Sequence, residues 1–486
     1  MAVFRYNSTL WPSNQGEEEI HFTLPPSKSL LIRRIFIQTA QFIRDPSIPT
    51  DDFSTRDSWV RTGGDDIESA LSLASMIRNT SSDPQVWEAG EAGTVMRFGL
   101  ALLVFAGKTG ILQGRGRAHA RPIGGLVEAL RQLGARIEYL EKEGYPPLQL
   151  KASTMHGGLV TLPSGISSQF ASAILLAGLC KDTTLELTWG PSLLPSRPYL
   201  DMTVAMLQQV GCRIETGPFG VRMDTRWGMK VATPVEGDWS AAAFWILRQA
   251  ALPLAPALNL TPLTEHSLQG DALLYRWLPW LEPAWNASFT AAKAGNKNTL
   301  RLPNCPSQAD GHAEASPAQN AQELPPMMEW DIQGDRWTCR AGAVPDLVPA
   351  LAVWAVLRGL KLEIQEIGHL VHKESNRLEA ITQNLQSVGI ECHILTKETH
   401  GDLADVEAGD TVLQILPTQP WVDHLQSSVP QRLLEFRSYQ DHRIVMAMSM
   451  LALPGWDLTF DDAGVVAKSY PLFWEHWKIL GYEWTS

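Results

Sequence analysis

Residues 24–34 read LPPSKSLLIRR. An alternating segment, residues 20–24, precedes this stretch and an apolar run follows it, so the pattern predicts a strand, a turn and the start of a helix. Free backbone N–H groups at a helix start carry positive partial charge, to which Lys28, Ser29 and Arg33 would add two cations and a hydroxyl. The turn is therefore a candidate seat for an anion such as phosphate, with a solvated basic turn as the alternative.

The length and charge of the chain limit the classes of protein it can belong to. It has 486 residues, 44% hydrophobic side chains and a formal net charge of −12. We expect two or more domains, because single cores rarely serve more than roughly 300 residues. The acidic balance argues against nucleic acid and anionic membranes as partners, so an anion site must be a local concentration of Lys and Arg.

Cysteine spacing and the distribution of apolar residues indicate a compartment. The five cysteines stand far apart, without the ligand spacing of a metal site, and we expect neither a metal nor another cofactor. The first residues lack the pattern of a signal peptide, and no apolar run reaches the roughly 20 residues needed to span a bilayer. We therefore expect a soluble cytoplasmic protein.

A repeat runs through the chain. A short apolar strand, a turn and a helix rich in small residues recur six times, with a period of roughly 70 residues in the first units. The turns fall at residues 27–29, 91–94, 167–169, 236–238, 344–346 and 440–442. A second helix follows in most units, and four of these end at Gly134, Gly211, Gly389 and Gly481, where glycine can close a helix. The pattern predicts α/β units of the order strand, helix, strand, helix, strand.

The second helices repeat a further feature at their expected starts. The segments are ARPIG (120–124), SRPY (196–199), HKESNR (372–377) and AKSYP (467–471), each with a cation. Because a cation opposes the dipole at a helix amino end, a bound anion would relieve the conflict. Exposed surface cations are the alternative for each one singly.

Three kinds of side chain gather at these turns. They are cations (Lys28, Arg33, Arg121, Lys373, Arg377, Arg443, Lys468), hydroxyls and an amide (Ser29, Thr94, Ser167, Ser168, Gln169, Ser196, Tyr199), and carboxylates (Asp346, Glu374, Asp441). These groups suit phosphate oxygens and a polyhydroxylated ring. With no phosphate-binding glycine–lysine loop of the Walker type, the inventory fits metal-free chemistry on two small anionic phosphoesters. Asp346 and Glu374 are the acid–base candidates, because a carboxylate among cations stays ionised and can accept a proton; simple charge balance is the alternative.

Eleven segments follow one another along the chain: SKS (27–29) with Arg33, AGTVMR (92–97), ARPIG (120–124), GYPPL (144–148), SSQF (167–170), SRPY (196–199), VEGD (235–238), VPD (344–346), KESNR (373–377), DHR (441–443) and AKSYP (467–471). In content and order they resemble the motifs of the 5-enolpyruvylshikimate-3-phosphate (EPSP) synthases. The resemblance implies a two-domain inside-out α/β barrel with three repeat units in each domain. Residues 25–237 would form the N-terminal domain, and 1–24 with 238–486 the C-terminal domain, with a low-complexity insertion near 304–323.

The resemblance also implies a reaction and its residues. The family joins shikimate 3-phosphate and phosphoenolpyruvate through a tetrahedral adduct that loses phosphate. By this similarity, shikimate 3-phosphate would be held by Ser29, Arg33, Ser167, Ser168, Ser196, Tyr199 and Lys373. Phosphoenolpyruvate would be held by Lys28, Gly93, Arg121, Gln169, Arg377, Arg443 and Lys468. Asp346 would be the base on the 5-hydroxyl, and Glu374 and Lys28 would transfer protons at the enolpyruvyl group. The family resemblance further suggests a monomer.

Six positions depart from the family pattern, and two of them are Leu31 and Ile32, which replace a Ser-Asn pair. Glu91 and His369 stand where the family has asparagines, Phe98 where it has a proline, and Pro26 where it has a glycine. These positions bear on the affinity for phosphoenolpyruvate and on inhibition by its mimic glyphosate.

Two rival hypotheses remain. The sister transferase acting on UDP-N-acetylglucosamine typically carries a cysteine before the ARP segment, whereas residues 110–122 contain none. The other rival is a homologue that binds a phosphorylated metabolite without turning it over.

Overall fold

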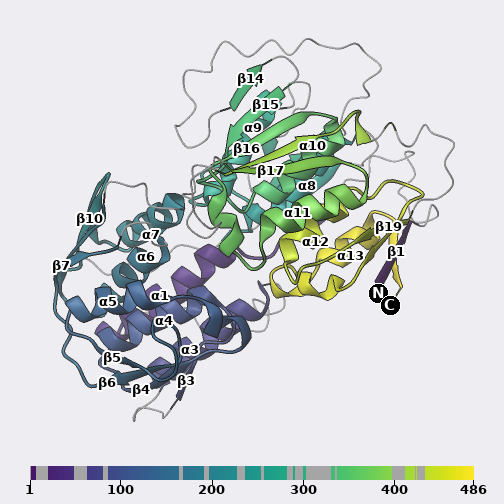
Figure 1. The fold of residues 1–486 in the computed structure, drawn as a ribbon. Coiled ribbons are helices and arrows are strands. Elements are labelled where there is room, and N and C mark those ends of the chain that lie inside the picture. The colour runs from purple at the N-terminus through teal and green to yellow at the C-terminus, as the bar shows by residue number, and fades with distance from the viewer. Residues whose placement is uncertain are drawn as a thin grey trace. The chain divides into compact units, whose positions relative to one another are not determined.

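The structure is a computed structural model, and it describes residues 2–6, 20–48, 63–79, 86–163, 168–190, 196–226, 236–252, 257–281, 288–290, 299–302, 330–333, 336–396, 411–421, 423 and 433–485. The chain forms two compact units, which we describe separately (Figure 1). The N-terminal unit is Pro26–Val235, and the C-terminal unit is Met1–Pro25 with Glu236–Ser486. Ser167 and the expected insertion near 304–323 lie outside the described residues.

The N-terminal unit contains two four-stranded sheets in its described part. One has the order β3-β4-β6-β5, with β3 Val86–Glu88, β4 Gly110–Gln113, β5 Arg136–Tyr139 and β6 Leu148–Lys151. The other has the order β7-β8-β10-β9, with β7 Gly158–Thr161, β8 Thr184–Thr188, β9 Arg213–Gly217 and β10 Gly220–Asp224. In each sheet the first pair is parallel and the other two pairs are antiparallel.

Along the chain, the helices of this unit either precede these strands or connect them. They are α1 Lys28–Arg44, α3 Asp65–Asn79, α4 Gly93–Phe105, η2 Gly116–Ala120, α5 Gly124–Gln132, α6 Ser168–Gly178 and α7 Arg197–Gln209. Helices α1, α4 and α6 pack on one another. Because α4 and α6 are apolar around nearly their whole circumference, they are buried as core helices.

The C-terminal unit contains three described sheets. Their orders are β19-β20-β1-β21, β12-β13-β11-β2 and β14-β15-β16-β18-β17. The strands are β1 Ala2–Tyr6, β2 Ile20–Thr23, β11 Leu258–Thr261, β12 Ser288–Thr290, β13 Thr299–Leu302, β14 Trp330–Gln333, β15 Arg336–Arg340, β16 Lys361–Gln365, β17 Glu391–Thr396, β18 Thr411–Leu416, β19 Leu433–Phe436, β20 Asp457–Phe460 and β21 Tyr482–Thr485.

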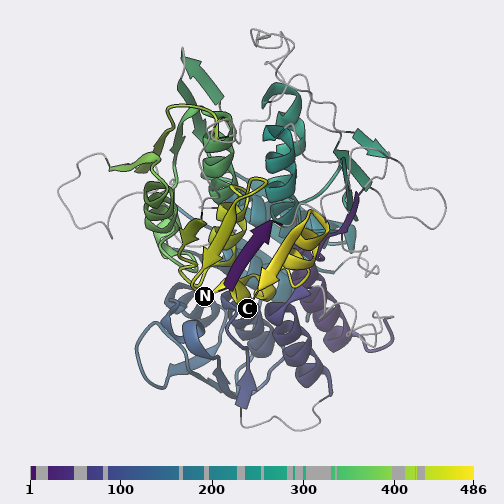
Figure 2. The same ribbon diagram turned by 90° about the vertical axis from the view of Figure 1, so that its right-hand side faces the viewer.

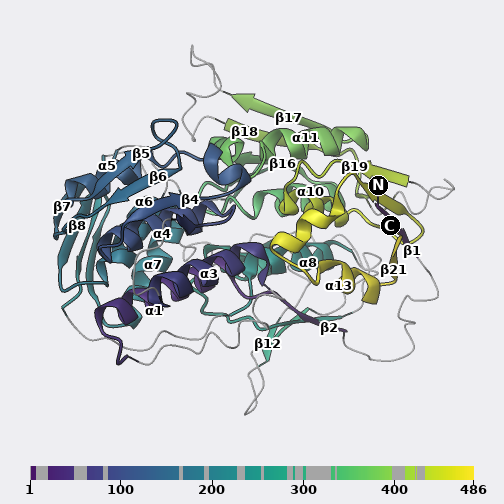
Figure 3. The ribbon, with the colours of Figure 1, turned by 90° about the horizontal axis from the view of Figure 1, so that it is seen from below.

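The two strands from the start of the chain complete sheets of this unit. Figure 2 shows the purple β1 between the yellow β20 and β21, with both pairings antiparallel. In Figure 3 the purple β2 lies by the teal strands of its sheet, where it pairs parallel with β11. Four of the five described sheets therefore contain one parallel pair followed by two antiparallel pairs, one strand more than the predicted unit. The fifth repeats this arrangement in β15, β16, β18 and β17 and adds β14 antiparallel to β15.

The helices of the C-terminal unit are α8 Trp239–Ala251, η3 Gly270–Ala272, α9 Leu273–Leu281, α10 Val348–Arg358, η6 Gly368–His372, α11 Arg377–Ser387, α12 His442–Ser449, η10 Ala463–Lys468 and α13 Phe473–Ile479. Helix α10 packs against both α8 and α12. All 13 residues of α8 are buried, as expected for a helix of small and apolar residues at the centre of a core.

A helix begins within each of the six predicted turns or no more than two residues after it. These helices are α1, α4, α6, α8, α10 and α12, so this prediction is confirmed. The four predicted helix-ending glycines have positive φ angles of 99°, 103°, 87° and 86°, in a conformation that glycine adopts without strain.

The predicted position of the cations at the second helices is only half right. Arg197 and Arg377 are the first residues of α7 and α11. Arg121, however, follows η2, and Lys468 is the last residue of η10, because a 3₁₀ helix precedes α5 and α13. The dipole argument therefore fails for these two cations, since a cation at a carboxyl end is favourable.

Candidate active site

The expected site residues lie in both units, and the first group surrounds the start of α1. The Ser27 hydroxyl caps this helix by accepting a hydrogen bond from the Leu30 N–H at 3.4 Å. One residue on, the Lys28 Nζ donates to the Asp66 Oδ2 at 2.6 Å. Both side chains of this pair are about a quarter exposed, at 23% and 25%. The Lys28 ammonium is thus held at the amino end of α1 by a carboxylate from α3.

Arg33 is an internal brace in this structure. Its side chain is buried, and it donates to the Thr203 hydroxyl at 2.7 Å, the Ser29 carbonyl at 2.8 Å and the Tyr199 carbonyl at 3.0 Å. Burial lowers the pKa of Arg33 to about 10. The guanidinium also lies 5.5 Å from the centre of the Phe98 ring. Arg33 therefore ties α1 to α7, and its contact with a substrate stays a prediction.

Two arginines gather at the amino end of α4, which has no side-chain cap. A Cβ atom on Gly93 would lie 2.6 Å from the Arg121 Nη1 and 2.9 Å from its Cδ, so Arg121 lies directly against Gly93. Arg97, one turn along, donates to the Gln169 Oε1 and, at 3.2 Å, to the Pro122 carbonyl. Burial, with a smaller contribution from Arg121, lowers the pKa of Arg97 to about 10.

Among the described residues, this pair of cations, Arg97 and Arg121, has no carboxylate as an ion-pair partner. The nearest departure from the family pattern, Glu91, is exposed and points elsewhere: its Oε1 would lie 3.1 Å from a Cβ atom on Gly116. Two close guanidinium groups and free helix N–H groups together favour an anion.

The remaining predicted residues of the N-terminal unit lie at two helix starts. Ser168 begins α6 and is buried, and the neighbouring Gln169 is held by Arg97. Ser196 is the residue before α7, where it has a left-handed φ of 56°, a conformation that costs energy for a non-glycine residue, and its side chain does not cap the helix. Tyr199 stands one turn into the same helix, and its ring lies 5.9 Å from the Arg33 guanidinium.

In the C-terminal unit, Asp346 is held between two arginines. Its Oδ1 accepts from the Arg377 Nη1 at 2.7 Å, and its Oδ2 accepts from the Arg443 Nη2 at 3.1 Å. The Asp346 side chain is 14% exposed, whereas that of Arg377 is 2% exposed. The turn before α10 thus presents a carboxylate with both oxygens oriented and some access to solvent.

A second carboxylate, Asp441, orients the same two arginines from inside. Its side chain is fully buried and accepts from the Arg377 Nε at 2.8 Å, from the Ser375 hydroxyl at 3.1 Å and from the Arg443 backbone N–H at 3.0 Å. Burial opposes the charge of Arg377, but Asp441 and Asp346 outweigh it and raise the pKa of this guanidinium. Arg377 is therefore a fixed cation at the start of α11.

Two lysines complete the predicted cations of this unit. Burial lowers the pKa of Lys373, and the nearby Arg377 and Arg443 lower it further, whereas Asp346 raises it. Such an ammonium is closer to releasing its proton than an exposed lysine. Lys468 is half-buried at the end of η10, which packs against α12, the helix that carries Arg443.

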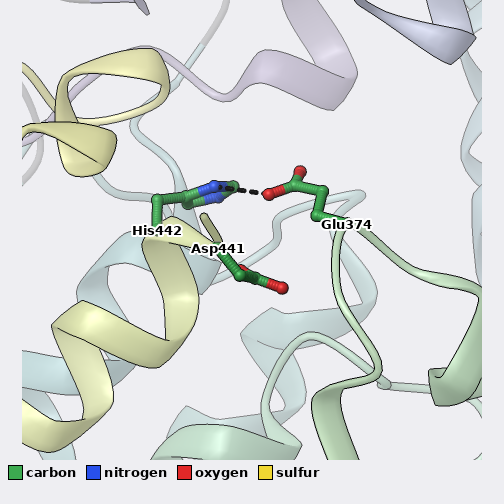
Figure 4. A group of neighbouring side chains, drawn as sticks. All are labelled: Glu374, Asp441 and His442. Atoms are coloured by element: carbon green, nitrogen blue, oxygen red, sulfur yellow. Dashed lines mark ion pairs between the residues drawn. The ribbon is translucent and has the colours of Figure 1, made fainter. Parts of the chain in front are cut away.

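Figure 4 shows Glu374, Asp441 and His442, whose ligand atoms lie within 4.8 Å of one another. The His442 Nδ1 is 2.8 Å from the Glu374 Oε2, but without the alignment of a hydrogen bond, so the contact is one of distance only. The oxygens of Asp441 already accept from Arg377, Ser375 and Arg443. A metal here would compete with those donors and face their positive charge, so the group does not have the character of a metal site.

A further buried carboxyl lies near Asp346. Asp271, at η3, accepts a hydrogen bond from the Ser240 hydroxyl of α8. Burial raises the pKa of Asp271 to about 7, and the negative charge of Asp346 adds to that rise. A carboxyl that keeps its proton near neutral pH adds no full negative charge beside Asp346.

Several of these neighbours were not among the residues predicted for the site. Asp66 follows two glycines and an aspartate, a typical acidic helix start that could have marked it as a partner for a basic turn. Arg97 stands inside the quoted segment 92–97, but no sequence pattern joins it to Gln169. Asp271 follows Gly270 in a turn, and its burial could not be read from composition.

Within the described residues, no helix combines the length and apolarity that a bilayer crossing requires. The family model described as "EPSP synthase (3-phosphoshikimate 1-carboxyvinyltransferase)" matches residues 60–287 and 337–477. A protein of Bacteroides fragilis named 3-phosphoshikimate 1-carboxyvinyltransferase is 28% identical over 424 residues, covering 86% of this chain and 90% of that protein. A Haemophilus influenzae protein of the same name is 30% identical over 402 residues, covering 80% of this chain and 78% of its own length.

Solved structures share the fold. The EPSP synthase of Acinetobacter baumannii aligns over the full length of both chains with a TM-score of 0.65 and 19% identity. An enolpyruvyl transferase from Streptomyces tendae aligns over all of this chain and 98% of that one, with a TM-score of 0.57 and 14% identity. The mixed helix and strand architecture of the present chain is the one found in these enzymes.

Proposed function

We propose, because this chain belongs to the EPSP synthase family, that it transfers the enolpyruvyl group of phosphoenolpyruvate to the 5-hydroxyl of shikimate 3-phosphate and releases phosphate. The curated relatives quoted above carry the name of that activity. The observation that supports it most in the structure is Asp346, a carboxylate held at both oxygens by Arg377 and Arg443 and still partly accessible.

The proposed chemistry begins with proton transfer. The 5-hydroxyl oxygen attacks C2 of phosphoenolpyruvate, and its proton passes to Asp346. A proton is added to the C3 methylene, for which Glu374 and Lys28 are the proposed donors. The resulting tetrahedral adduct then loses phosphate as a proton leaves the new methyl group, which restores the double bond. The guanidinium partners keep Asp346 ionised, the form that can accept the hydroxyl proton.

The proposed binding roles are divided between the two substrates as the family resemblance implies. Phosphoenolpyruvate is held by Lys28, Gly93, Arg121, Gln169, Arg377, Arg443 and Lys468. Shikimate 3-phosphate is held by Ser29, Arg33, Ser167, Ser168, Ser196, Tyr199 and Lys373. The closeness of Arg97 and Arg121 beside Gly93 supports an anion in the N-terminal unit, because a dianionic phosphate group would offset their mutual repulsion.

The architecture we propose is the inside-out α/β barrel of two domains, 25–237 and 1–24 with 238–486, with three repeat units in each. The pattern shared by the five described sheets supports it, since each contains four neighbouring strands joined by one parallel and two antiparallel pairs. A cytoplasmic location and a monomeric state are part of the same proposal.

The test is phosphate release from shikimate 3-phosphate and phosphoenolpyruvate. Asp346→Asn keeps the shape of the side chain but removes the base, so we expect kcat to fall by about 10²- to 10⁴-fold. The matched control is Asp182→Asn, which changes an exposed carboxylate that pairs with Arg44. Far-ultraviolet circular dichroism of both variants should match the wild type.

Two outcomes would contradict the proposal in different ways. A wild-type chain that binds shikimate 3-phosphate but releases no phosphate would be a binding homologue and not the enzyme. A wild-type rate in Asp346→Asn would leave the activity intact and remove Asp346 from its role as base.

A further inference from the structure

The loop that carries Lys468 is anchored to the core by the tyrosine two residues later. Lys468 ends η10, and the Tyr470 N–H donates to the Val466 carbonyl at 2.8 Å. The Tyr470 carbonyl in turn accepts from the Phe473 N–H at 3.1 Å, at the start of α13. The Tyr470 side chain is 1% exposed, so the turn between η10 and α13 has one side chain fixed inside the unit.

The Tyr470 hydroxyl has two partners, one from each of two helices. The Trp245 Nε1 of α8 lies 3.2 Å from the hydroxyl oxygen, and the His476 Nδ1 of α13 lies 2.7 Å from it. An indole N–H can only donate, so the tyrosine oxygen accepts from Trp245 and its single proton is left for His476. The arrangement that gives this proton a partner has His476 accepting at Nδ1, as the neutral imidazole with its own proton on Nε2.

The surroundings of His476 agree with this direction of the hydrogen bonds. The ring is 5% exposed and stacks on Phe22 with the ring centres 4.2 Å apart and the planes 7° from parallel. Burial lowers the pKa of His476 to about 4, so the imidazole is neutral at pH 7. The chain Trp245–Tyr470–His476 is thus a directed pair of hydrogen bonds inside an apolar cluster.

The arrangement gives the hydroxyl a directional role that packing alone does not require. A phenylalanine at position 470 would fill nearly the same volume, but it would leave the Trp245 N–H and the His476 Nδ1 without their partner. A buried polar group without a partner is unfavourable, so the three side chains specify one position for the turn. That turn follows Lys468 directly, and η10 packs on α12, which carries Arg443.

We propose that Tyr470, oriented by Trp245 and His476, is a positioning residue that fixes Lys468 for binding phosphoenolpyruvate. The proposal rests on the proposed function, in which Lys468 holds that substrate. Tyr470 itself touches the core and not the substrate, so its effect passes through the backbone of the turn.

The first experiment compares two hydroxyl deletions in the same aromatic cluster. Tyr470→Phe is expected to raise the KM for phosphoenolpyruvate by about fivefold to tenfold, with the KM for shikimate 3-phosphate and kcat within about threefold of wild type. The control is Tyr482→Phe, another buried tyrosine, whose ring lies 5.0 Å from that of Trp477. We expect the control to lower the thermal midpoint without changing either KM. Unchanged KM values in Tyr470→Phe, with only a lower midpoint, would overturn the proposal.

The second experiment tests the direction of the Trp245–Tyr470–His476 hydrogen bonds, which we call the relay, and whether their effect on substrate binding passes through Lys468. His476→Gln keeps an acceptor for the tyrosine proton, so its KM for phosphoenolpyruvate should stay near the wild-type value. His476→Leu removes that acceptor and should behave as Tyr470→Phe does. In a Lys468→Met background, Tyr470→Phe should add no further increase in KM, because the two changes act on one contact. Additive increases would show that Tyr470 acts on another group.

Failure of the proposed function is separable from failure of this inference. If the wild type releases no phosphate, the enzyme proposal fails. The relay is then tested by its effect on the affinity for phosphoenolpyruvate, measured by calorimetric titration in the presence of shikimate 3-phosphate. A weaker affinity in Tyr470→Phe but not in Tyr482→Phe would support the relay. Equal affinities, or no binding that depends on Lys468, would overturn it.

Discussion

The buried histidine of α13 should make the stability of the C-terminal unit depend on pH. Burial lowers the pKa of His476 from 6.5 to about 4, so the unfolded chain takes up the proton first as the pH falls. The stabilisation is therefore complete above about pH 6.5 and is lost progressively as the pH falls toward 4. Since one pKa unit corresponds to about 1.4 kcal/mol, the full loss is about 3.5 kcal/mol, of which about 1.4 kcal/mol is lost by pH 5.5.

The substitution His476→Gln isolates this contribution, because glutamine can accept the Tyr470 proton but does not titrate. Urea unfolding followed by tryptophan fluorescence at pH 7.5, 6.5 and 5.5 gives the free energy of unfolding for both chains. Other groups titrate equally in the two, so the wild type should lose about 1.4 kcal/mol more than the variant between pH 7.5 and 5.5. His393→Gln, at an exposed histidine of β17, is the matched control.

Parallel curves for the wild type and His476→Gln would refute this reasoning. They would mean that His476 binds its proton as easily in the folded chain as in the unfolded one, and the neutral Nε2–H form that the Tyr470 hydrogen bond requires would lose its basis. A steeper curve in the variant would have the same consequence, since it would reverse the sign of the linkage.

Two predictions concern the amino end of α4. Gly93→Ala should raise the KM for phosphoenolpyruvate, measured by phosphate release, by about tenfold. The reason is that the added Cβ would lie 2.6 Å from the Arg121 Nη1 and displace that cation. An unchanged KM would show that Arg121 does not bind phosphoenolpyruvate beside Gly93. Glu91→Gln should change the same KM by less than about twofold, because the carboxylate is exposed beside Gly116 and forms no ion pair with a described cation; a larger fall in KM would mean that Glu91 repels the substrate.

The sequence predicted the local structure well, because the signals for it are local. The turn at 27–29 gives a capped helix at Lys28, and the four closing glycines have the left-handed conformation that ends a helix. The extra strands of the sheets were not predicted, because strands of four residues such as β5 and β6 are too short for their alternation to be distinguished from chance. That β1 completes a sheet with β20 and β21 depends on pairing over more than 450 residues, which no local signal encodes.

Side-chain partners were beyond the sequence for the same reason. Arg33 looked like a free cation one turn into a helix, yet its donors are taken up by Thr203 and two backbone carbonyls. The pairing of Lys28 with Asp66 joins residues 38 positions apart, and that of Arg97 with Gln169 joins residues 72 apart. Charge and spacing alone could name candidate cations, but only the fold decides which of them already donate hydrogen bonds within the protein.

The two groups of cations differ in a way that bears on their roles. Arg377 and Arg443 share Asp346, so a ligand carboxylate in the C-terminal unit would have to compete with an existing ion pair. Arg97 and Arg121 repel each other without a described carboxylate between them, so an anion there replaces repulsion by attraction. Arg97 and Arg121 are therefore stabilised more by a dianion such as a phosphate group. Arg377 and Arg443, already paired with Asp346, are suited to orient that base and to bind a singly charged carboxylate.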